Sequence, residues 1–266
     1  MTKSDASSPE ALVIRNDDQG VCELILNRPN AYNALSIAGM EALIHEFEAL
    51  SHDSSIRAVI ISGSGKGFCA GHDLGEMQGV GTRPFYEKTF ETCAKMMTLI
   101  SALPQPVIAK VHGIATAAGC QLVATCDLAV ASQSSKFATP GVNIGLFCST
   151  PMVPLSRVLS KKHAMELLLL GDMISATRAW EMGLINRAVP LDELDACARN
   201  MAKTLASKSP IAVKMGKKAF HDQMDMPIHD AYKACVRVIV ENMMTHDAQE
   251  GISAFMEKRH PTWSGT

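Results

Sequence analysis

Short runs of apolar residues dominate the first half of the chain, and several of them are bounded by proline, glycine or asparagine. Residues 11–16 and 21–27 flank the polar segment 17–20, which is typical of a β-hairpin. Ser36 is a candidate N-cap for a helix to about residue 51, because apolar residues recur there every three or four positions. Three more buried strands are expected at 57–62, 106–111 and 127–131.

Between these strands the pattern changes twice. Residues 75–82 are rich in glycine, and we expect them to be mobile. Pro84 is suited to a helix start, and the helix should run to about residue 102, before Pro104 and Pro106 end it. The strand–turn–helix order predicts an α/β fold, a spiral of βαβ-like units.

Helical spacing takes over in the second half of the chain. Seven helices are expected, at 151–159, 162–170, 176–182, 192–206, 211–225, 228–245 and 247–258. We therefore divide the chain into a flexible tail (1–10), a core (11–190) and a C-terminal helical subdomain (191–266).

Composition excludes several classes of protein. A length of 266 residues suits one large domain, and 47% hydrophobic with 20% charged residues is ordinary for a globular protein. A net charge of −2 gives no basic surface for nucleic acid. The 8 cysteines lack metal-ligand spacing and indicate reduced thiols, so we expect no metal. Without a membrane-spanning run, signal core or arginine-rich leader, we expect a cytoplasmic protein.

Two turns stand out as candidate chemistry. The strand ending at Val111 leads through Gly113 and small residues into a helix start at Ala118, and the strand 57–62 leads through glycines to His72. Unpaired N–H groups at such turns suit a developing negative charge on oxygen. The alternative is that small residues there only allow a helix to pack closely on a strand.

The two turns belong to a longer set of motifs that follow one another through most of the chain. The motifs are Leu26-Asn27-Arg28-Pro29, Asn33-Ala34-Leu35, Phe68-Cys69-Ala70-Gly71-His72-Asp73-Leu74, Ala118-Gly119-Cys120-Gln121-Leu122, Cys126-Asp127, Phe137-Ala138-Thr139-Pro140 and Gly251 to Arg259. Together they resemble the crotonase (enoyl-CoA hydratase/isomerase) superfamily. Within it, the chain resembles a subgroup of hydratase-domain-containing proteins with the same Ala-Ala-Gly-Cys-Gln and Thr-Pro-Gly substitutions.

The resemblance implies a backbone oxyanion hole for an acyl-CoA thioester, formed by the N–H groups of His72 and Ala118. Relatives commonly have glycine where this chain has Ala117 and Ala118. Because we expect helix-start geometry at negative φ, an added Cβ should be tolerated.

The resemblance also implies that the usual acid/base pair is missing. Hydratases of this type use two glutamates, and their positions are occupied here by Gln121 and Gly141. Loss of both carboxylates could slow hydration by about 10⁴ or more. Cys148 is a speculative substitute, with a buried thiol as the alternative. The His72 imidazole is either a replacement acid/base or important only for its N–H.

For coenzyme A, which would enter as part of the substrate and not as a separate cofactor, the resemblance implies a binding surface along Ala31, Ala70 and the segment His72-Asp73-Leu74-Gly75. Phe255 and Lys258 would approach the adenosine phosphate from a neighbouring subunit, since helical tails of crotonases pack in a homotrimer or a dimer of trimers. The alternative for Lys258 is a solvated cation.

We therefore expect an enoyl-CoA hydratase/isomerase-family protein that binds an acyl-CoA thioester in fatty-acid or acyl-CoA metabolism. The resemblance favours an enzyme, an enoyl-CoA hydratase-like lyase, but the replacement of both glutamates by Gln121 and Gly141 leaves activity open. The alternatives are a decarboxylase or isomerase that uses enolate stabilisation, and a non-catalytic acyl-CoA binder.

Overall fold

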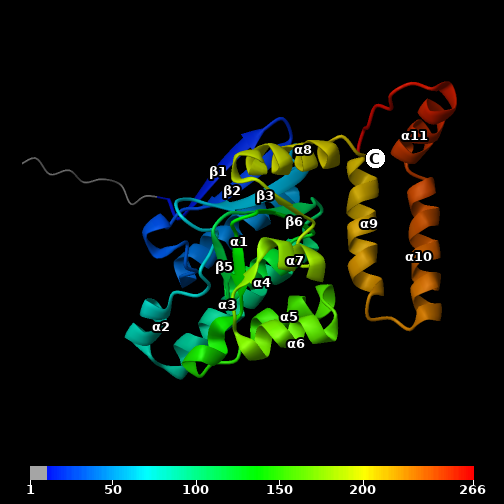
Figure 1. Ribbon diagram of the computed structural model, residues 1–266. Coiled ribbons are helices and arrows are strands. Elements are labelled where there is room, and N and C mark those ends of the chain that lie inside the picture. Colours follow the sequence, from blue (N-terminus) through cyan, green and yellow to red (C-terminus); the bar gives the residue numbers. More distant parts are fainter. Residues whose placement is uncertain (1–10) are drawn as a thin grey trace, which may run out of the picture.

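A six-stranded sheet forms the centre of the molecule, as the computed structural model of residues 11–266 shows (Figure 1). Its strands follow the order β1-β2-β3-β4-β6-β9, and every neighbouring pair is parallel except the β1–β2 hairpin. The bounds are β1 Val13–Asp18, β2 Val21–Leu26, β3 Ala58–Gly63, β4 Val107–Val111, β6 Leu128–Ser132 and β9 Arg187–Val189. The hairpin and the buried strands expected from the sequence are confirmed, whereas the expected tail 1–10 lies outside the described residues.

A smaller sheet of three strands was not expected. It contains β5 (Ile114–Thr116), β7 (Lys136–Ala138) and β8 (Ile174–Ser175). The strands β5 and β8 are only 3 and 2 residues long, too short for a periodic signal. Because β5 directly precedes the turn at Ala118, this second sheet positions the candidate site.

Helices cover both faces of the large sheet, and the alternation along β3 explains the division. Val59 and Ile61 face the larger core, which is closed by α1 (Ile37–His52), α3 (Arg83–Ala102), α4 (Ala118–Thr125), α5 (Ser149–Val158), α6 (Lys161–Leu170) and α7 (Ala176–Met182). Ala58 and Ile60 face α8 (Leu194–Ala206), which packs through Ala198 and Ala202.

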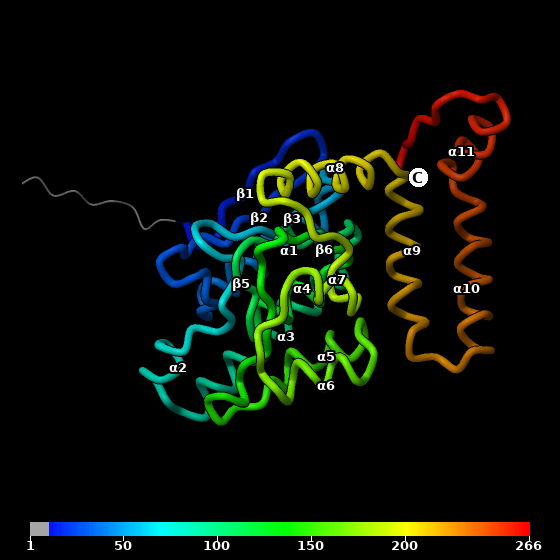
Figure 2. The backbone as a smooth tube through the Cα atoms, in the orientation of Figure 1, coloured from blue at the N-terminus to red at the C-terminus, as the bar shows by residue number. Residues whose placement is uncertain are grey.

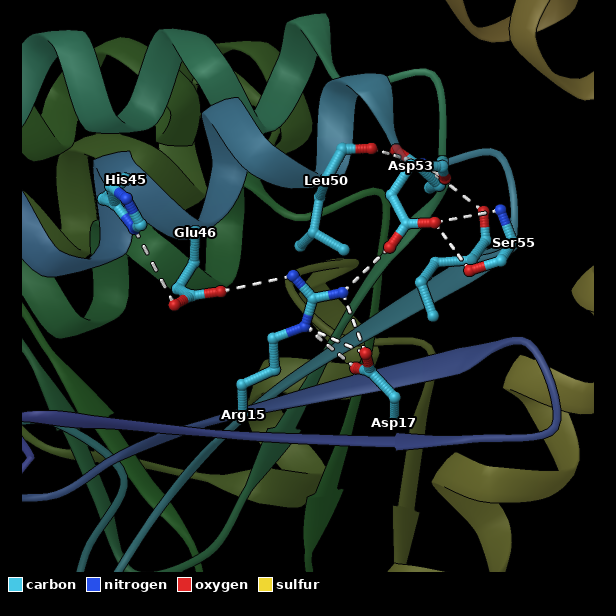
Figure 3. A network of polar contacts seen from close by, with 9 residues as sticks. Arg15, Asp17, His45, Glu46, Leu50, Asp53 and Ser55 are labelled. Carbon is cyan, nitrogen blue, oxygen red and sulfur yellow. Dashed lines mark hydrogen bonds and ion pairs between the residues drawn. The ribbon is translucent and has the colours of Figure 1, made fainter.

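The N-terminal hairpin is tied to α1 by one guanidinium (Figure 3). Arg15 on β1 pairs with Asp17 at 2.8 Å, with Asp53 at 3.0 Å and with Glu46 at 3.4 Å. Asp53 in turn accepts hydrogen bonds from the backbone and side chain of Ser55. The cluster fixes the outer strand against the end of the helix and lies apart from the candidate site.

The chain ends in three helices that stand to one side of the sheet in Figures 1 and 2. They are α9 (Pro210–Gln223), α10 (Ile228–Met243) and α11 (His246–Glu257). Lys217 anchors α9, because its ammonium donates to the carbonyls of Ile100 at 2.9 Å and Gln105 at 3.0 Å and to Asp127 at 2.7 Å. Helix α10 leaves large apolar side chains exposed, among them Ile228, Tyr232, Val236, Ile239 and Val240.

The helices α2 and α8 differ from what the sequence predicted. Residues 75–82 were expected to be mobile, but α2 (Leu74–Val80) is a helix, because the Asp73 side chain accepts the N–H of Glu76 and caps its first turn. Helix α8, which we placed in the C-terminal subdomain, packs on the sheet, and buried Glu23 bonds Arg199 of this helix at 2.9 Å. The division of the chain at residue 190 stays a prediction.

Candidate functional site

The segment 68–71 lies alongside β5 as if it were one more strand. Cys69 pairs with Ala115 in a parallel bridge. The Cys69 N–H donates to the Ile114 carbonyl at 3.1 Å, and the Thr116 N–H donates to the Cys69 carbonyl at 3.0 Å. Two residues beyond this bridge the segments reach Gly71 and Ala117. The register therefore brings the turn before α2 beside the turn before α4.

Gly71 marks the point of closest approach of the two turns. It has φ +99°, and a Cβ at this position would lie 2.9 Å from the Cβ of Ala117 and 3.2 Å from the nitrogen of Ala118. Only glycine fits here without a shift. In the turn before α2, the residue after Gly71 is His72. In the turn before α4, the residue after Ala117 is Ala118, the first residue of α4.

The N–H groups of His72 and Ala118 are both free. Neither donates a hydrogen bond to any atom of residues 11–266, although Ala118 is completely buried. A buried N–H without an acceptor costs on the order of 1–3 kcal/mol, and a ligand oxygen would remove that cost. The two turns are therefore brought together as the sequence predicted.

A short network holds the His72 turn in place. Leu35 donates to the Gly71 carbonyl at 2.7 Å and accepts from the Asp73 N–H at 3.0 Å, bracketing His72 on both sides. Arg28 pairs with Asp73 at 2.8 Å, and this pairing holds the pKa of the Asp73 carboxyl below its usual value. We did not predict a role for Arg28, although it stands in a motif quoted above.

Buried Asn33 is a second positioning residue that sequence reasoning missed. Its side chain accepts the N–H of Arg28 at 2.9 Å and donates to the carbonyls of Ser64 at 2.9 Å and Gly67 at 2.8 Å. The side chain is only 2% exposed. Its hydrogen bonds connect the loop that contains Ala31 with the glycine-rich turn after β3. Its place in the motif Asn33-Ala34-Leu35 was the available signal.

Some of the residues expected to bind coenzyme A lie close together, and that role stays a prediction. Ala70 donates to the carbonyl of Tyr32 at 3.0 Å, which places it beside the loop of Ala31, and exposed Leu74 and Gly75 begin α2. Phe255 and Lys258 lie elsewhere: they are exposed on and after α11, on the opposite side of the molecule from α2 (Figure 1).

The imidazole of His72 is neutral near pH 7, because burial lowers its pKa to about 4. Its ring meets Phe90 of α3 edge to face, with the centroids 5.2 Å apart. The buried Nε2 atom has no hydrogen-bond partner among residues 11–266. Such a ring can accept or donate a hydrogen bond, but it does not supply a charge.

Gln121 and Gly141, at the two positions where the resemblance implies glutamates, are both buried. Gln121, with an exposed fraction of 3%, lies one helical turn after Ala118, and its Oε1 is 4.0 Å from the Cys93 sulfur. Gly141 has no room for a side chain, since a Cβ there would lie 2.8 Å from the carbonyl oxygen of Leu146 and 2.9 Å from the sulfur of Cys148. Burial raises the pKa of the Cys148 thiol, so it is protonated near pH 7.

One backbone expectation was wrong. Ala117 has φ 49° and ψ −117°, not the negative φ of a helix start. A Cβ in this region of the Ramachandran map is strained, and glycine would be relaxed there. Ala118, in contrast, is the first residue of α4. Of the two alanines, therefore, only Ala117 has a strained backbone conformation.

Over residues 11–266, no helix is long and apolar enough to cross a membrane, and no cluster of histidine, cysteine, aspartate and glutamate is arranged for a metal ion.

Comparison with known proteins identifies the family. The family profile described as enoyl-CoA hydratase/isomerase matches residues 16–266. The chain belongs to this family. The enoyl-CoA hydratase domain-containing protein 3 of Xenopus laevis is 44% identical over 253 residues, which cover 95% of this chain and 86% of the relative.

Solved structures of the family confirm the crotonase-type α/β fold. An enoyl-CoA hydratase of Mycobacterium smegmatis is 50% identical with a TM-score of 0.93, and the match covers 96% of this chain and 99% of that one. The human enoyl-CoA hydratase domain-containing protein 3 is 42% identical with a TM-score of 0.93, over 95% and 100% of the two chains. The expected similarity to hydratase-domain-containing proteins is thus confirmed, whereas their sharing of the substitutions at Gln121 and Gly141 stays a prediction.

The expectation of a cytoplasmic location is contradicted by the names of these relatives. Five vertebrate members of the family, 41% to 44% identical to this chain, are named as mitochondrial proteins. Composition carried no information on this point, since reduced cysteines are compatible with either compartment.

The strained Ala117 gives a first prediction. Ala117→Gly should raise the free energy of unfolding by about 1 kcal/mol, because release of strain exceeds the entropy that glycine adds to the unfolded chain. Ala118→Gly is the matched control, and it should lower that free energy by about 0.5–1 kcal/mol as a helical substitution. Urea unfolding of both variants measures the difference, and a loss of stability in both would contradict the strain.

The crowding at Gly141 gives a second prediction. Gly141→Ala should destabilise the fold by about 1–3 kcal/mol, because its Cβ meets a backbone oxygen and a sulfur. Gly216→Ala is the control, since that helical position has open space around it and should gain stability. Equal changes in the melting temperature of the two variants would contradict this prediction, because they would show that the loop 141–148 moves away from the added Cβ at little cost.

Proposed function

We propose that this chain binds an acyl-CoA thioester, with the thioester oxygen between the N–H groups of His72 and Ala118. The observation that carries the proposal is the pair of free N–H groups at adjacent turns, one of them completely buried. Each donor of this kind stabilises a developing oxyanion by about 3 kcal/mol. The family to which the chain belongs supports a place in acyl-CoA metabolism.

The coenzyme A part of the ligand would lie along the surface of Ala31, Ala70 and Asp73 to Gly75. The pairing of Arg28 with Asp73 supports this placement, because it holds that surface and the His72 turn in one rigid unit. Coenzyme A then enters and leaves with the substrate, and no separate cofactor is proposed.

We further propose that the protein assembles as a homotrimer or a dimer of trimers. The exposed apolar side chains of α10 support an interface there. Phe255, with 81% of its surface exposed, would contact the adenosine end of the ligand in a neighbouring copy, together with Lys258.

The chemistry that best fits the site requires an oxyanion hole but no protein base. Gln121 and Gly141 occupy the positions at which the resemblance implies carboxylates, the Cys148 thiol is protonated near pH 7, and the His72 imidazole is neutral. Decarboxylation of a malonyl-type thioester meets this condition and is our second candidate. The carbon–carbon bond to the carboxylate breaks, its electron pair forms the thioester enolate, carbon dioxide leaves, and water supplies the proton to the α-carbon.

Removal of one donor tests the binding mode. Ala118→Pro replaces the donor N–H by a ring carbon, so thioester binding should fall about tenfold or more while free coenzyme A binding changes little. Calorimetric titration with butyryl-CoA and with coenzyme A measures both. Ala118→Gly keeps the donor and serves as the comparison, and equal losses for the two ligands would refute the assignment.

A substrate panel tests the chemistry. Crotonyl-CoA hydration should be slower by about 10⁴ or more than in a relative with two glutamates, and Gln121→Glu alone should not restore it. Turnover of malonyl-type thioesters to carbon dioxide would favour the second candidate. Rapid hydration by the unaltered protein would show that another group carries the proton, and His72→Ala and Cys148→Ala would then be the variants to measure.

A further inference from the structure

A cavity of about 300 Å³ lies where the core meets the last helices of the chain. Its wall is formed by residues from the end of α1 to the start of β3, by the loop before β4, by the end of α8, by the start of α9 and by residues 264 and 265. Arg57 in this wall directly precedes β3, whereas the turns of the candidate site follow the other ends of β3 and β4. Since β3 has 6 residues and rises about 3.3 Å per residue, roughly 20 Å of strand separates the two places.

Three cations line this cavity without a partner of opposite charge. They are Arg57, Lys208 and Lys214, and the side chain of none of them forms an ion pair or a hydrogen bond within residues 11–266. Asp53 is the one carboxylate among the lining residues, and it already pairs with Arg15 at 3.0 Å. The cavity therefore carries an excess of positive charge, although the chain as a whole has a net charge of −2.

The start of α9 adds a backbone donor to the same wall. This helix has 14 residues, and the side chain of its N-cap, Ser209, accepts the N–H of Ala212 at 3.2 Å. The N–H of Ile211, a lining residue in the first turn, donates to no atom in the described part of the chain. Free N–H groups and the positive end of the helix dipole attract anions. Lys208 and Lys214 come from either side of this helix start, so all these donors border one cavity.

Gln105, another lining residue, brings an unused acceptor. The residue is only 6% exposed, and its Nε2 donates to the carbonyls of Leu50 at 2.8 Å, Asp53 at 3.2 Å and Ile56 at 3.3 Å. These bonds fix the end of α1 and the loop after it. The Oε1 atom of the same amide is buried and has no hydrogen-bond partner among residues 11–266. Buried polar atoms are normally paired, and a hydroxyl or amino group of a ligand would supply the missing donor.

Apolar side chains complete the wall and separate the charged groups from the core. They include Ile56, Leu205, Ile211 and Val213. A largely apolar lining with a few polar groups is typical of sites for small molecules, and the volume of this cavity is at the lower end of their range. A matching ligand therefore combines several negative charges, a hydrogen-bond donor and a ring or hydrocarbon surface.

We infer that this cavity binds a nucleotide with two or more phosphate groups, at a site separate from the candidate site. The phosphates would lie between Arg57, Lys208 and Lys214, the base would pack on the apolar side chains, and a hydroxyl or amino group would reach Gln105. Inorganic polyphosphate would meet only the cations, and a nucleoside would meet only the remaining groups. Because the ligand would join Arg57 of the core to Lys214 of α9, it would stabilise the attachment of the last helices. The inference does not depend on the proposed function.

Calorimetric titration of the full chain with ADP, pyrophosphate and adenosine tests the inference. We expect saturable binding of one ADP per chain, about tenfold or more tighter than pyrophosphate or adenosine, and a melting temperature that rises with the concentration of ADP. Lys214→Glu should weaken ADP binding about tenfold or more, because it replaces an attraction by a repulsion. Lys214 is exposed, so the variant should fold, and Lys208→Glu repeats the change at a second exposed lining position.

Lys203→Glu is the matched control. Lys203 is an exposed residue of α8, it does not line the cavity, and it makes no ion pair in the part of the chain that the structure describes. Its reversal changes the net charge by the same amount, yet the affinity for ADP should stay within about twofold at about 0.15 M salt, since screening limits the effect of distant charges.

Coenzyme A itself contains an ADP group, so a competition experiment separates the two sites. Saturating butyryl-CoA should leave the affinity for ADP within about twofold, because the proposed thioester site lies at the other ends of β3 and β4. Displacement of ADP by butyryl-CoA would place ADP on the coenzyme A surface and overturn the inference. So would the absence of saturable ADP binding up to about 10 mM, pyrophosphate or adenosine binding as tightly as ADP, or equal losses in Lys214→Glu and Lys203→Glu. The proposed function fails separately, if butyryl-CoA binds no more tightly than coenzyme A and Ala118→Pro changes neither.

Discussion

The backbone pairing of segment 68–71 with β5 is the interaction on which the candidate site depends. Two hydrogen bonds, between Cys69 and its neighbours Ile114 and Thr116, set the register of two turns that are almost fifty residues apart in the chain. Because the register is fixed by backbone atoms, the site tolerates changes in side chains as long as Gly71 keeps its positive φ. The two free N–H groups therefore do not depend on the side chains at Gln121 and Gly141, the positions where the resemblance implies glutamates.

Because backbone atoms fix these turns, the groups proposed to bind the thioester are separate from the groups that would carry out proton transfer. The donors of the proposed site belong to the backbone, whereas the acid/base groups that the resemblance implies belong to side chains and can be lost one by one. At Gly141 the sulfur of Cys148 and the carbonyl of Leu146 occupy the space that a side chain would need. Ala117, in contrast, retains a strained backbone at the turn that presents the Ala118 donor.

Much of the fold was accessible from the sequence because its strands and helices carry strong periodic signals. The hairpin, α1 with its Ser36 cap and the paired glycine turns were predicted from their residues, and the family resemblance connected them. The short strands β5 and β8 were missed, because three or two residues cannot show a period. The extent of helix α2 over residues 75–80 was not predicted, because its cap, Asp73, comes from the turn before a glycine-rich segment.

Within the candidate site, the two turns were predictable from the sequence, but the residues that hold them in place were not. The roles of Arg28 and Asn33 depend on partners up to forty-five residues away, which no local pattern reveals. The location of the protein was predicted wrongly, since neither composition nor motif distinguishes the compartments of reduced proteins.

The most direct test of the account is the infrared spectrum of butyryl-CoA labelled with carbon-13 at the thioester carbonyl. Two N–H groups aimed at that oxygen polarise the bond, so its stretching frequency should fall on binding below the value in water. Ala118→Pro should remove part of the shift. A bound thioester whose carbonyl frequency equals that in water would contradict the oxyanion hole between His72 and Ala118.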